Sequence, residues 1–252
     1  MFASSRDGTR VAYDVTGQGP ALVLLHGAGK TRRDWHKVGY VERLEDDFSV
    51  IAVDLRGTGE SDVLTEVSDY QIERICEDVT AVADACGAER FRVWGYSFGG
   101  HVGKYLAALT DRVVALAVIG VHLWGPTVDE PLDRFITDFD NKWRPWATTR
   151  RAGNPVEQAK RSAIKSRVPV WLACFEAMRS WPAIEPGGIK CPSLLVAGAK
   201  GQTGAAEWAE ANSEALESAG FQADVISGLD HLQEFTEIDR VFPVVRQFFE
   251  EG

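Results

Sequence analysis

One serine lies in a setting that favours nucleophilic chemistry. Ser97 is the centre of Gly95-x-Ser97-x-Gly99, which joins an apolar stretch typical of a buried strand, 92–96, to a helical pattern over 99–109. Such a sharp turn leaves no room for side chains at its flanking positions, holds the serine in a strained conformation and exposes its hydroxyl. The amide of Phe98 points at the same place. We therefore predict a nucleophile, although an unreactive serine in a glycine-rich turn fits the same five-residue pattern.

Strands and helices alternate around this serine. Continuous apolar runs predict strands that are covered on both faces, and segments with helical spacing of apolar residues separate them. This order is typical of βαβ units and therefore of a mostly parallel sheet flanked by helices, an α/β fold. The predicted strands are 9–15, 21–25, 48–53, 92–96, 112–120, 192–198 and 222–226, and the clearest helices are 70–86, 99–109, 205–218 and 236–250.

The alternation stops over residues 121–190, which contain no convincing strand. The pairs Asn154-Pro155 and Val168-Pro169 resemble helix starts, so we expect two or three helices inserted over the sheet. The domain prediction is a single domain, with a core of 1–120 and 191–252 and a helical cap of about 121–190. The cap segment holds five of the eight tryptophans: Trp124, Trp143, Trp146, Trp171 and Trp181.

Composition narrows the class of protein. The chain has 252 residues, 45% of them hydrophobic, and a net charge of −10, which argues against nucleic acid or an anionic membrane as the main partner. Residues 1–8 are too short and polar for a signal peptide, and no apolar run is long enough to span a membrane. The four cysteines lack metal-ligand spacing and are interpreted as reduced thiols. We therefore expect a cytoplasmic protein without metal or organic cofactor.

Four motifs, in this order and at these distances, resemble the α/β-hydrolase superfamily from about residue 9 onward. They are His26-Gly27, Asp54-x-Arg56-Gly57-x-Gly59-x-Ser61, Gly95-x-Ser97-x-Gly99 and Gly228-x-x-His231. The resemblance is specific for the fold and much less so for the reaction, because one fold hosts many functions.

The resemblance implies roles for particular residues. Ser97 would attack an acyl carbonyl, His231 would take its proton, and the amides of Ala28 and Phe98 would hold the developing oxyanion. By the same resemblance His26 would orient its loop rather than carry a proton. Asp54 and Arg56 are expected to brace a loop, whereas His36 and His101 have no assigned chemistry.

The acid that normally orients the histidine is missing from both usual places. After Gly198 the positions hold Lys200 and Gly201, and at the end of the earlier strand His122 stands where a carboxylate would. Asp230 is adjacent to His231 and cannot easily fold back onto its ring. Loss of this acid costs a serine protease roughly 10⁴ in turnover, yet a serine–histidine pair with an oxyanion hole retains activity.

Three interpretations remain open: a hydrolase with an unusual acid, a dyad enzyme acting on an activated substrate, and a receptor or binding protein with residual turnover. Cofactor-free carbon–carbon cleavage, lyase or oxygenase chemistry is a further alternative. The first predicts hydrolysis of an ester, lactone or related carbonyl bond in a small hydrophobic molecule, by a monomer or homodimer. We expect His122 and Trp124 to border the pocket, with the aromatic cap selecting the substrate.

Overall fold

Short apolar segments form the strands of one mixed sheet in the computed structural model. The structure describes residues 1–148 and 155–251, with side chains described outside 146–166. Within these residues eight strands are hydrogen-bonded in the order β1-β2-β4-β3-β5-β6-β7-β8. Their bounds are β1 Phe2–Ser4, β2 Arg10–Thr16, β3 Ala21–Leu25, β4 Ser49–Val53, β5 Phe91–Tyr96, β6 Val113–Ile119, β7 Ser193–Gly198 and β8 Gln222–Ile226. The pairs β1/β2 and β2/β4 are antiparallel and the others parallel. The predicted α/β-hydrolase fold is confirmed.

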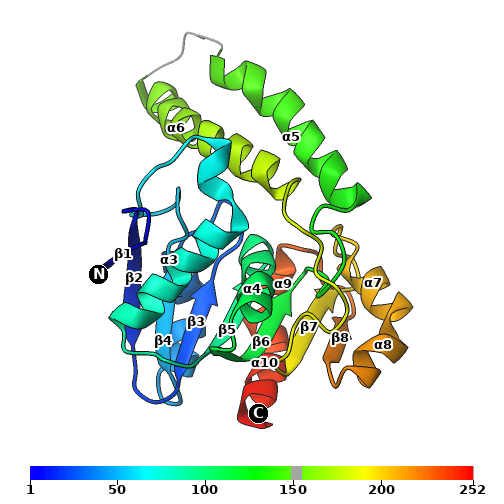
Figure 1. Ribbon diagram of the computed structural model, residues 1–252. Helices are drawn as coiled ribbons and strands as arrows, with labels where there is room; N and C mark the ends of the chain where they lie inside the picture. Colours follow the sequence, from blue (N-terminus) through cyan, green and yellow to red (C-terminus); the bar gives the residue numbers. More distant parts are fainter. Residues whose placement is uncertain (149–154, 252) are drawn as a thin grey trace.

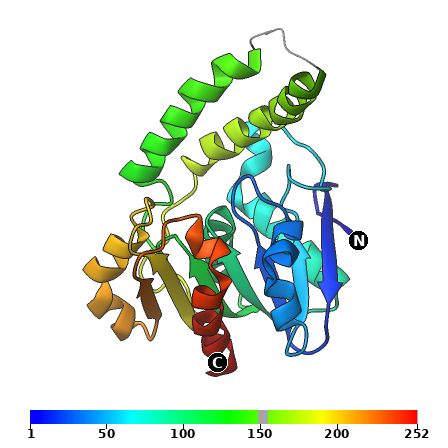
Figure 2. The same cartoon turned by 180° about the vertical axis from the view of Figure 1, so that it is seen from behind.

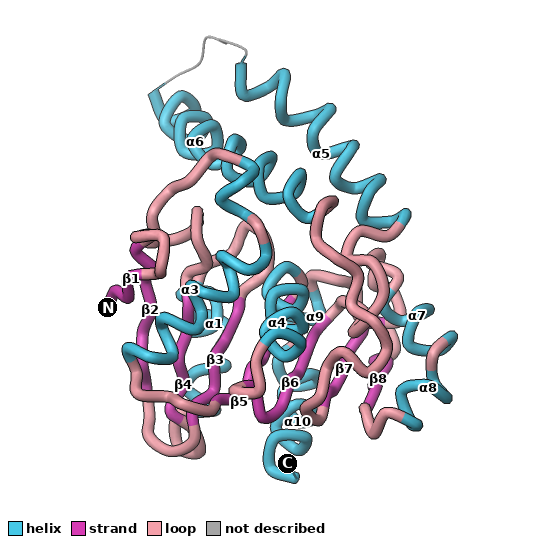
Figure 3. Tube along the Cα trace, in the orientation of Figure 1, coloured by secondary structure: helices cyan, strands magenta, loops and turns pink. Residues whose placement is uncertain are grey.

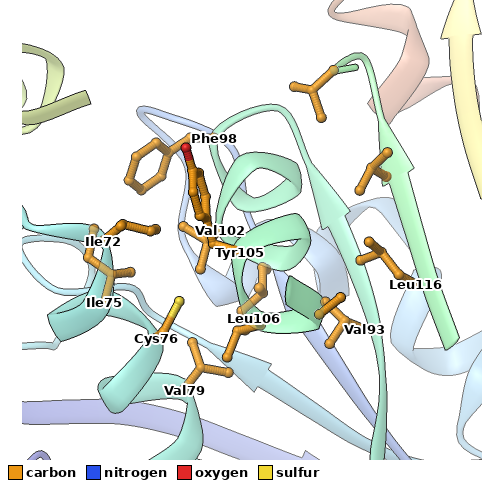
Figure 4. Close-up of a cluster of buried hydrophobic side chains, with 14 of the residues drawn as sticks. Ile72, Ile75, Cys76, Val79, Val93, Phe98, Val102, Tyr105, Leu106 and Leu116 are labelled. Carbon is orange, nitrogen blue, oxygen red and sulfur yellow. The ribbon is translucent and has the colours of Figure 1, made fainter. Parts of the chain in front are cut away.

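Helices cover both faces of this sheet (Figures 1 and 2). One face carries α3 (Ile72–Ala85) and α4 (Phe98–Leu109), and the other carries α1 (Arg32–Val38), α2 (Tyr40–Leu44) and α10 (Ile238–Glu251). Figure 4 shows the first layer in detail: Ile75 and Val79 of α3 face Val102 and Leu106 of α4. Because both faces are covered, the central strands are almost wholly apolar.

Two long helices lie between β6 and β7 and project above the sheet as a hairpin (Figure 3). They are α5 (Glu130–Thr148) and α6 (Pro155–Met178). Their facing aromatic rings are in contact, with Phe139 centred 5.2 Å from Phe175 and 5.9 Å from Trp171. The hairpin therefore has an aromatic seam of its own. None of the described helices has the length and apolar character that crossing a bilayer requires.

Several predicted boundaries need correction. Pro155 begins α6 as expected, but Pro169 lies inside this helix, where it removes one backbone donor without ending the helix. The segment 205–218 forms two short helices, α7 (Ala205–Ala211) and α8 (Ser213–Ser218). The closing helix is α10 (Ile238–Glu251), two residues later than predicted, and a separate short turn, α9 (Gln233–Thr236), precedes it. Strand β1 and the 3₁₀ turn η1 (Val67–Tyr70) were not predicted.

Candidate active site

The turn around Ser97 has the strained geometry that its glycines predict. Ser97 has φ 52° and is the one non-glycine residue with positive φ in the described chain. A Cβ atom at Gly95 would overlap the carbonyl oxygen of Gly99, and one at Gly99 would overlap that of Leu25. Glycine at both positions is what allows α4 to start directly at the end of β5. The Ser97 hydroxyl is thereby presented at the carboxyl edge of the sheet.

His231 comes to this serine from the loop after β8. Its Nε2 lies 2.9 Å from the Ser97 Oγ, a hydrogen-bonding distance. The Tyr96 ring stacks on the imidazole with centroids 5.2 Å apart, and its hydroxyl donates to the His231 carbonyl at 2.6 Å. Burial raises the pKa of Tyr96, so this hydroxyl keeps its proton and remains a donor. Ring and backbone of His231 are therefore both held against the end of β5.

A carboxylate does reach the second ring nitrogen, and it belongs to Glu234. Glu234 Oε2 lies 2.6 Å from His231 Nδ1, and Oε1 accepts the Gly198 amide at 2.7 Å. The side chain is almost wholly buried, with 1% of its surface exposed. The two usual places for an acid hold no carboxylate, as the sequence predicted, and the Glu234 carboxylate comes from a third position, so the contact favours the interpretation with an unusual acid.

The short turn α9 brings Glu234 into place. The Asp230 carboxylate accepts the Gln233 amide at 2.8 Å and its backbone carbonyl accepts the Glu234 amide at 2.9 Å. Residues three apart on a helical turn share one face, so Glu234 lies under His231. This spacing, His-x-x-Glu directly after the last strand, is the sequence signal that could have identified the acid.

Two glycines leave the space that the Glu234 carboxylate fills. A Cβ atom at Gly120, which has φ 71°, would overlap Glu234 Oε2, and one at Gly201 would lie 2.9 Å from Oε1. Gly201 follows β7 and lies at one of the two usual places for an acid, and Gly120 follows β6 two residues before His122, which stands at the other. The Glu234 carboxylate, which comes from the same loop as His231, thus occupies space that side chains at the two strand ends would otherwise fill.

The predicted oxyanion donors lie on either side of Ser97. Ala28 and Phe98 both line the cavity, and within the described chain neither amide donates a hydrogen bond. In the parallel pairing of β3 with β5, Leu25 lies opposite Gly95, so the loop after β3 comes to Ser97. Gly27 permits this approach, because a Cβ there would be 2.7 Å from the Tyr96 ring and 3.2 Å from the Ser97 Cβ.

The flanking motif residues hold loops, as expected. The buried His26 ring has its Nδ1 2.9 Å from the Gly27 carbonyl and accepts the Leu55 amide at Nε2, 3.2 Å away. Asp54 accepts the backbone amides of Arg32 and Glu60. The Arg56 guanidinium forms a bidentate pair with the buried Asp78. These contacts stabilise the carboxyl edge of the sheet without reaching Ser97.

A cavity of about 660 Å³ opens over Ser97 and His231. Its upper wall comes from the helical hairpin and contains Leu132, Phe135, Phe175 and Met178. His122 also lines it, so this residue lies where we expected it. A cavity of this size, with an apolar wall and a few polar groups beside the reactive atoms, suits a small molecule.

Trp124 lies elsewhere, and its expected place in the wall is corrected. It is not among the described lining residues; its ring packs against Trp208 at 4.7 Å and Phe221 at 6.2 Å. Trp208 belongs to α7, so Trp124 packs against that helix. Trp143 and Trp171 are also outside the described lining, and the Trp146 side chain is outside the described residues.

Comparison with known proteins defines the class of protein. Residues 20–183 match the family model of the alpha/beta hydrolase fold, which is more than half of the chain. The chain therefore belongs to the α/β-hydrolase fold family.

Individual relatives cover less of the sequence. An uncharacterised protein of Mycobacterium tuberculosis is 33% identical over 118 residues, 45% of this chain and 33% of the relative. A fluoroacetate dehalogenase of Burkholderia sp. is 34% identical over 128 residues, 48% of this chain and 40% of the relative. The matched segments thus span well under half the length of these relatives. The structure of a thermophilic esterase from Thermogutta terrifontis superposes with a TM-score of 0.76 at 24% identity, covering 100% of this chain and 98% of that one. This last likeness is one of fold.

Proposed function

We propose that the protein is a serine hydrolase that cleaves an ester, lactone or related carbonyl bond in a small hydrophobic molecule. The observation that carries the proposal is the unbroken chain from Glu234 through His231 to Ser97, with 2.6 Å and 2.9 Å between hydrogen-bonding atoms. Nucleophile, base and orienting acid in this arrangement are the parts that acyl transfer requires.

Each residue has one part in the proposed reaction. Glu234 accepts a hydrogen bond from Nδ1–H of His231, which leaves Nε2 as the base. Ser97 Oγ then bonds to the carbonyl carbon while its proton passes to Nε2, and the amides of Ala28 and Phe98 hold the oxyanion. The bond to the leaving oxygen breaks as Nε2–H returns the proton to it. Water repeats the sequence on the acyl-enzyme and frees Ser97.

The substrate class rests on the cavity walls. The catalytic groups are indifferent to what hangs from the carbonyl, whereas Leu132, Phe135, Phe175 and Met178 form an apolar wall above them. The structural likeness to an esterase from T. terrifontis agrees with an ester as substrate. One relative by sequence is named a fluoroacetate dehalogenase, so family membership by itself does not identify the substrate. We further propose that the protein acts without cofactor in the cytoplasm, as a monomer or homodimer.

The receptor interpretation started from the absence of an acid, and Glu234 removes that starting point. A fluorophosphonate probe discriminates between the proposed serine hydrolase, a receptor, and cofactor-free carbon–carbon cleavage, lyase or oxygenase chemistry. We expect stoichiometric labelling of wild-type protein and none of Ser97→Ala, with equal melting temperatures for both. Hydrolysis of p-nitrophenyl butyrate should be lost in the same variant. Wild-type protein that is folded but neither labelled nor hydrolytic would overturn the proposal.

A further inference from the structure

A second group of polar side chains lies beside the catalytic residues and takes no part in the proposed steps. His101 and Lys104 stand three residues apart on α4, so they share one face of that helix. His122 follows β6 and Asp129 precedes α5. Three of these residues, His101, His122 and Asp129, line the cavity that contains Ser97. We refer to the four residues as the basic cluster.

Direct contacts join the cluster. Lys104 Nζ lies 3.4 Å from His122 Nδ1 and 3.3 Å from the His122 carbonyl oxygen. The other ring nitrogen of His122 is 3.8 Å from Asp129 Oδ2. The His101 ring meets that of His122 edge to face, with centroids 5.9 Å apart. Lys104, at 0% exposure, therefore stands directly behind a histidine that faces the cavity.

Two buried polar atoms of the cavity wall have no hydrogen-bond partner in the described chain. They are Nδ1 of His101, a residue with 6% of its surface exposed, and Oγ1 of Thr203. Both residues line the cavity. An unsatisfied buried polar group costs about 1–3 kcal/mol, and both residues border the same cavity, so a ligand in this cavity is a partner that the two atoms lack.

The charges specify the chemistry of that ligand. Burial lowers the pKa of Lys104 to about 7, against the weaker opposing effect of Asp129. Burial and then Lys104 lower the pKa of His122 to about 3, and burial, Lys104, His122 and His231 lower that of His101. Both histidines are therefore neutral near pH 7, and no carboxylate of the described chain lies within ion-pairing distance of Lys104 Nζ, whose nearest polar partners are Nδ1 and the carbonyl oxygen of His122. An added anion would favour the charged form of Lys104, whereas a neutral hydroxyl would not.

We infer that this wall is a subsite for a carboxylate on the substrate, bound by His101 and His122 with Lys104 behind them. The inference rests on the proposed function, since it names the substrate class of the same site: an ester that carries an acidic group on one of its two halves. The apolar upper wall would hold the remainder of the molecule.

Binding to Ser97→Ala protein tests the subsite independently of turnover. The probes are monobutyl succinate and butyl levulinate, which differ in one place: the first carries a carboxylate where the second has a methyl ketone. By titration calorimetry we expect monobutyl succinate to bind about tenfold more tightly. In Ser97→Ala/Lys104→Met the preference should fall to about twofold or less, whereas Ser97→Ala/Lys190→Met, changed at an exposed lysine, should keep it. Lys104→Gln replaces Lys104→Met if the latter does not fold.

Proton uptake gives a second readout that a purely structural lysine would not move. At about pH 8 most of Lys104 is neutral in the free protein, so a bound carboxylate should draw up to one proton from buffer. Titrations in phosphate and Tris should reveal this uptake for monobutyl succinate and none for butyl levulinate. Equal affinities for the two probes, or a preference unchanged by Lys104→Met, would overturn the inference. Because the protein lacks Ser97, neither outcome depends on whether the wild type is a hydrolase.

Discussion

Glu234 reaches His231 from within one turn of chain, so a single loop supplies both the proposed base and the proposed acid. The two carboxylate oxygens are used differently: Oε2 meets the imidazole, while Oε1 accepts the Gly198 amide. The second contact fixes the carboxylate at the end of β7, and burial removes competing water. The orientation of the imidazole then depends on a residue that the strand ends themselves do not provide.

Glu234→Gln tests this orienting role. The amide keeps the shape but can donate to Nδ1, which would favour the tautomer with its proton on Nε2, unable to act as a base. We expect kcat on p-nitrophenyl butyrate to fall about 10²–10⁴-fold with KM little changed. Glu237→Gln, at an exposed position three residues further on, should behave as wild type. A Glu234→Gln enzyme within twofold of wild type would show that His231 needs no acid here.

Gly201→Asp should have opposite effects in two backgrounds. In the wild type the new side chain would crowd Glu234, because its Cβ would start 2.9 Å from Oε1 and bring a second negative charge. We expect activity to fall at least about tenfold. With Glu234→Ala the same substitution puts a carboxylate at one of the usual places, and kcat should rise about tenfold or more above Glu234→Ala alone. Unchanged kcat in both backgrounds would mean that residue 201 cannot reach His231.

In the proposed function, the hairpin of α5 and α6 would recognise the substrate, and the core would carry out the catalysis. The two hairpin helices contact each other through aromatic rings and present Leu132, Phe135, Phe175 and Met178 to the cavity. Residues of the core sheet contribute the reactive groups instead. Substitutions in these two elements should therefore change different kinetic quantities.

Phe135 and Trp124 give a matched pair of aromatic truncations. Phe135 is 52% exposed and lines the cavity, so Phe135→Ala should lower kcat/KM for a bulky aromatic ester about fivefold relative to an acetyl ester. Trp124 is 7% exposed and packs on Trp208, so Trp124→Ala should destabilise the fold by about 3–5 kcal/mol and affect both esters equally. Kinetics with the two esters and thermal melts check both statements, and selectivity lost in Trp124→Ala alone would reverse the assignment.

At the scale of the whole molecule, burial of neutral histidines couples stability to pH. Burial lowers the pKa of His26, His101 and His122, the last to about 3. Between about pH 3 and 6.5 the unfolded chain therefore binds more protons than the folded one, and stability rises with pH across this window. Acidification through it should destabilise the protein, since these side chains must be charged on unfolding.

His122→Phe isolates one part of this dependence. In urea titrations, the free energy of unfolding of the wild type should fall between about pH 6.5 and 4, and the variant should lose less over the same interval. The expected difference in slope approaches one proton, about 1.4 kcal/mol per pH unit. Identical slopes would show that His122 takes up no additional proton on unfolding.

Much of the architecture was predictable because its signals are local. The apolar runs 21–25 and 92–96 correspond to β3 and β5 within a residue, since strands covered on both faces need continuous apolar sequence. Gly95 and Gly99 predict the turn at Ser97, because a side chain at either position would overlap the backbone. His231 was placed by its position after the last strand. Strand β1 was not predicted, because a strand of three residues has too little pattern to recognise. The position of Pro169 within α6 was not predicted either, because a proline does not always end a helix.

By itself the sequence determined the order of strands and helices, the strained turn at Ser97 and the histidine that follows β8, because each depends on neighbours along the chain. Only the tertiary structure decided which acid meets that histidine and which aromatic residues line the cavity. Glu234 is defined by the space that Gly120 and Gly201, 81 residues apart in sequence, leave at adjacent strand ends. Trp124 and Phe135 are both aromatic residues between β6 and β7, and only the folded structure shows that Phe135 lines the cavity whereas Trp124 does not. Space and direction are properties of packing among distant segments, so the local His-x-x-Glu spacing can suggest the acid but does not show that its carboxylate has room beside His231.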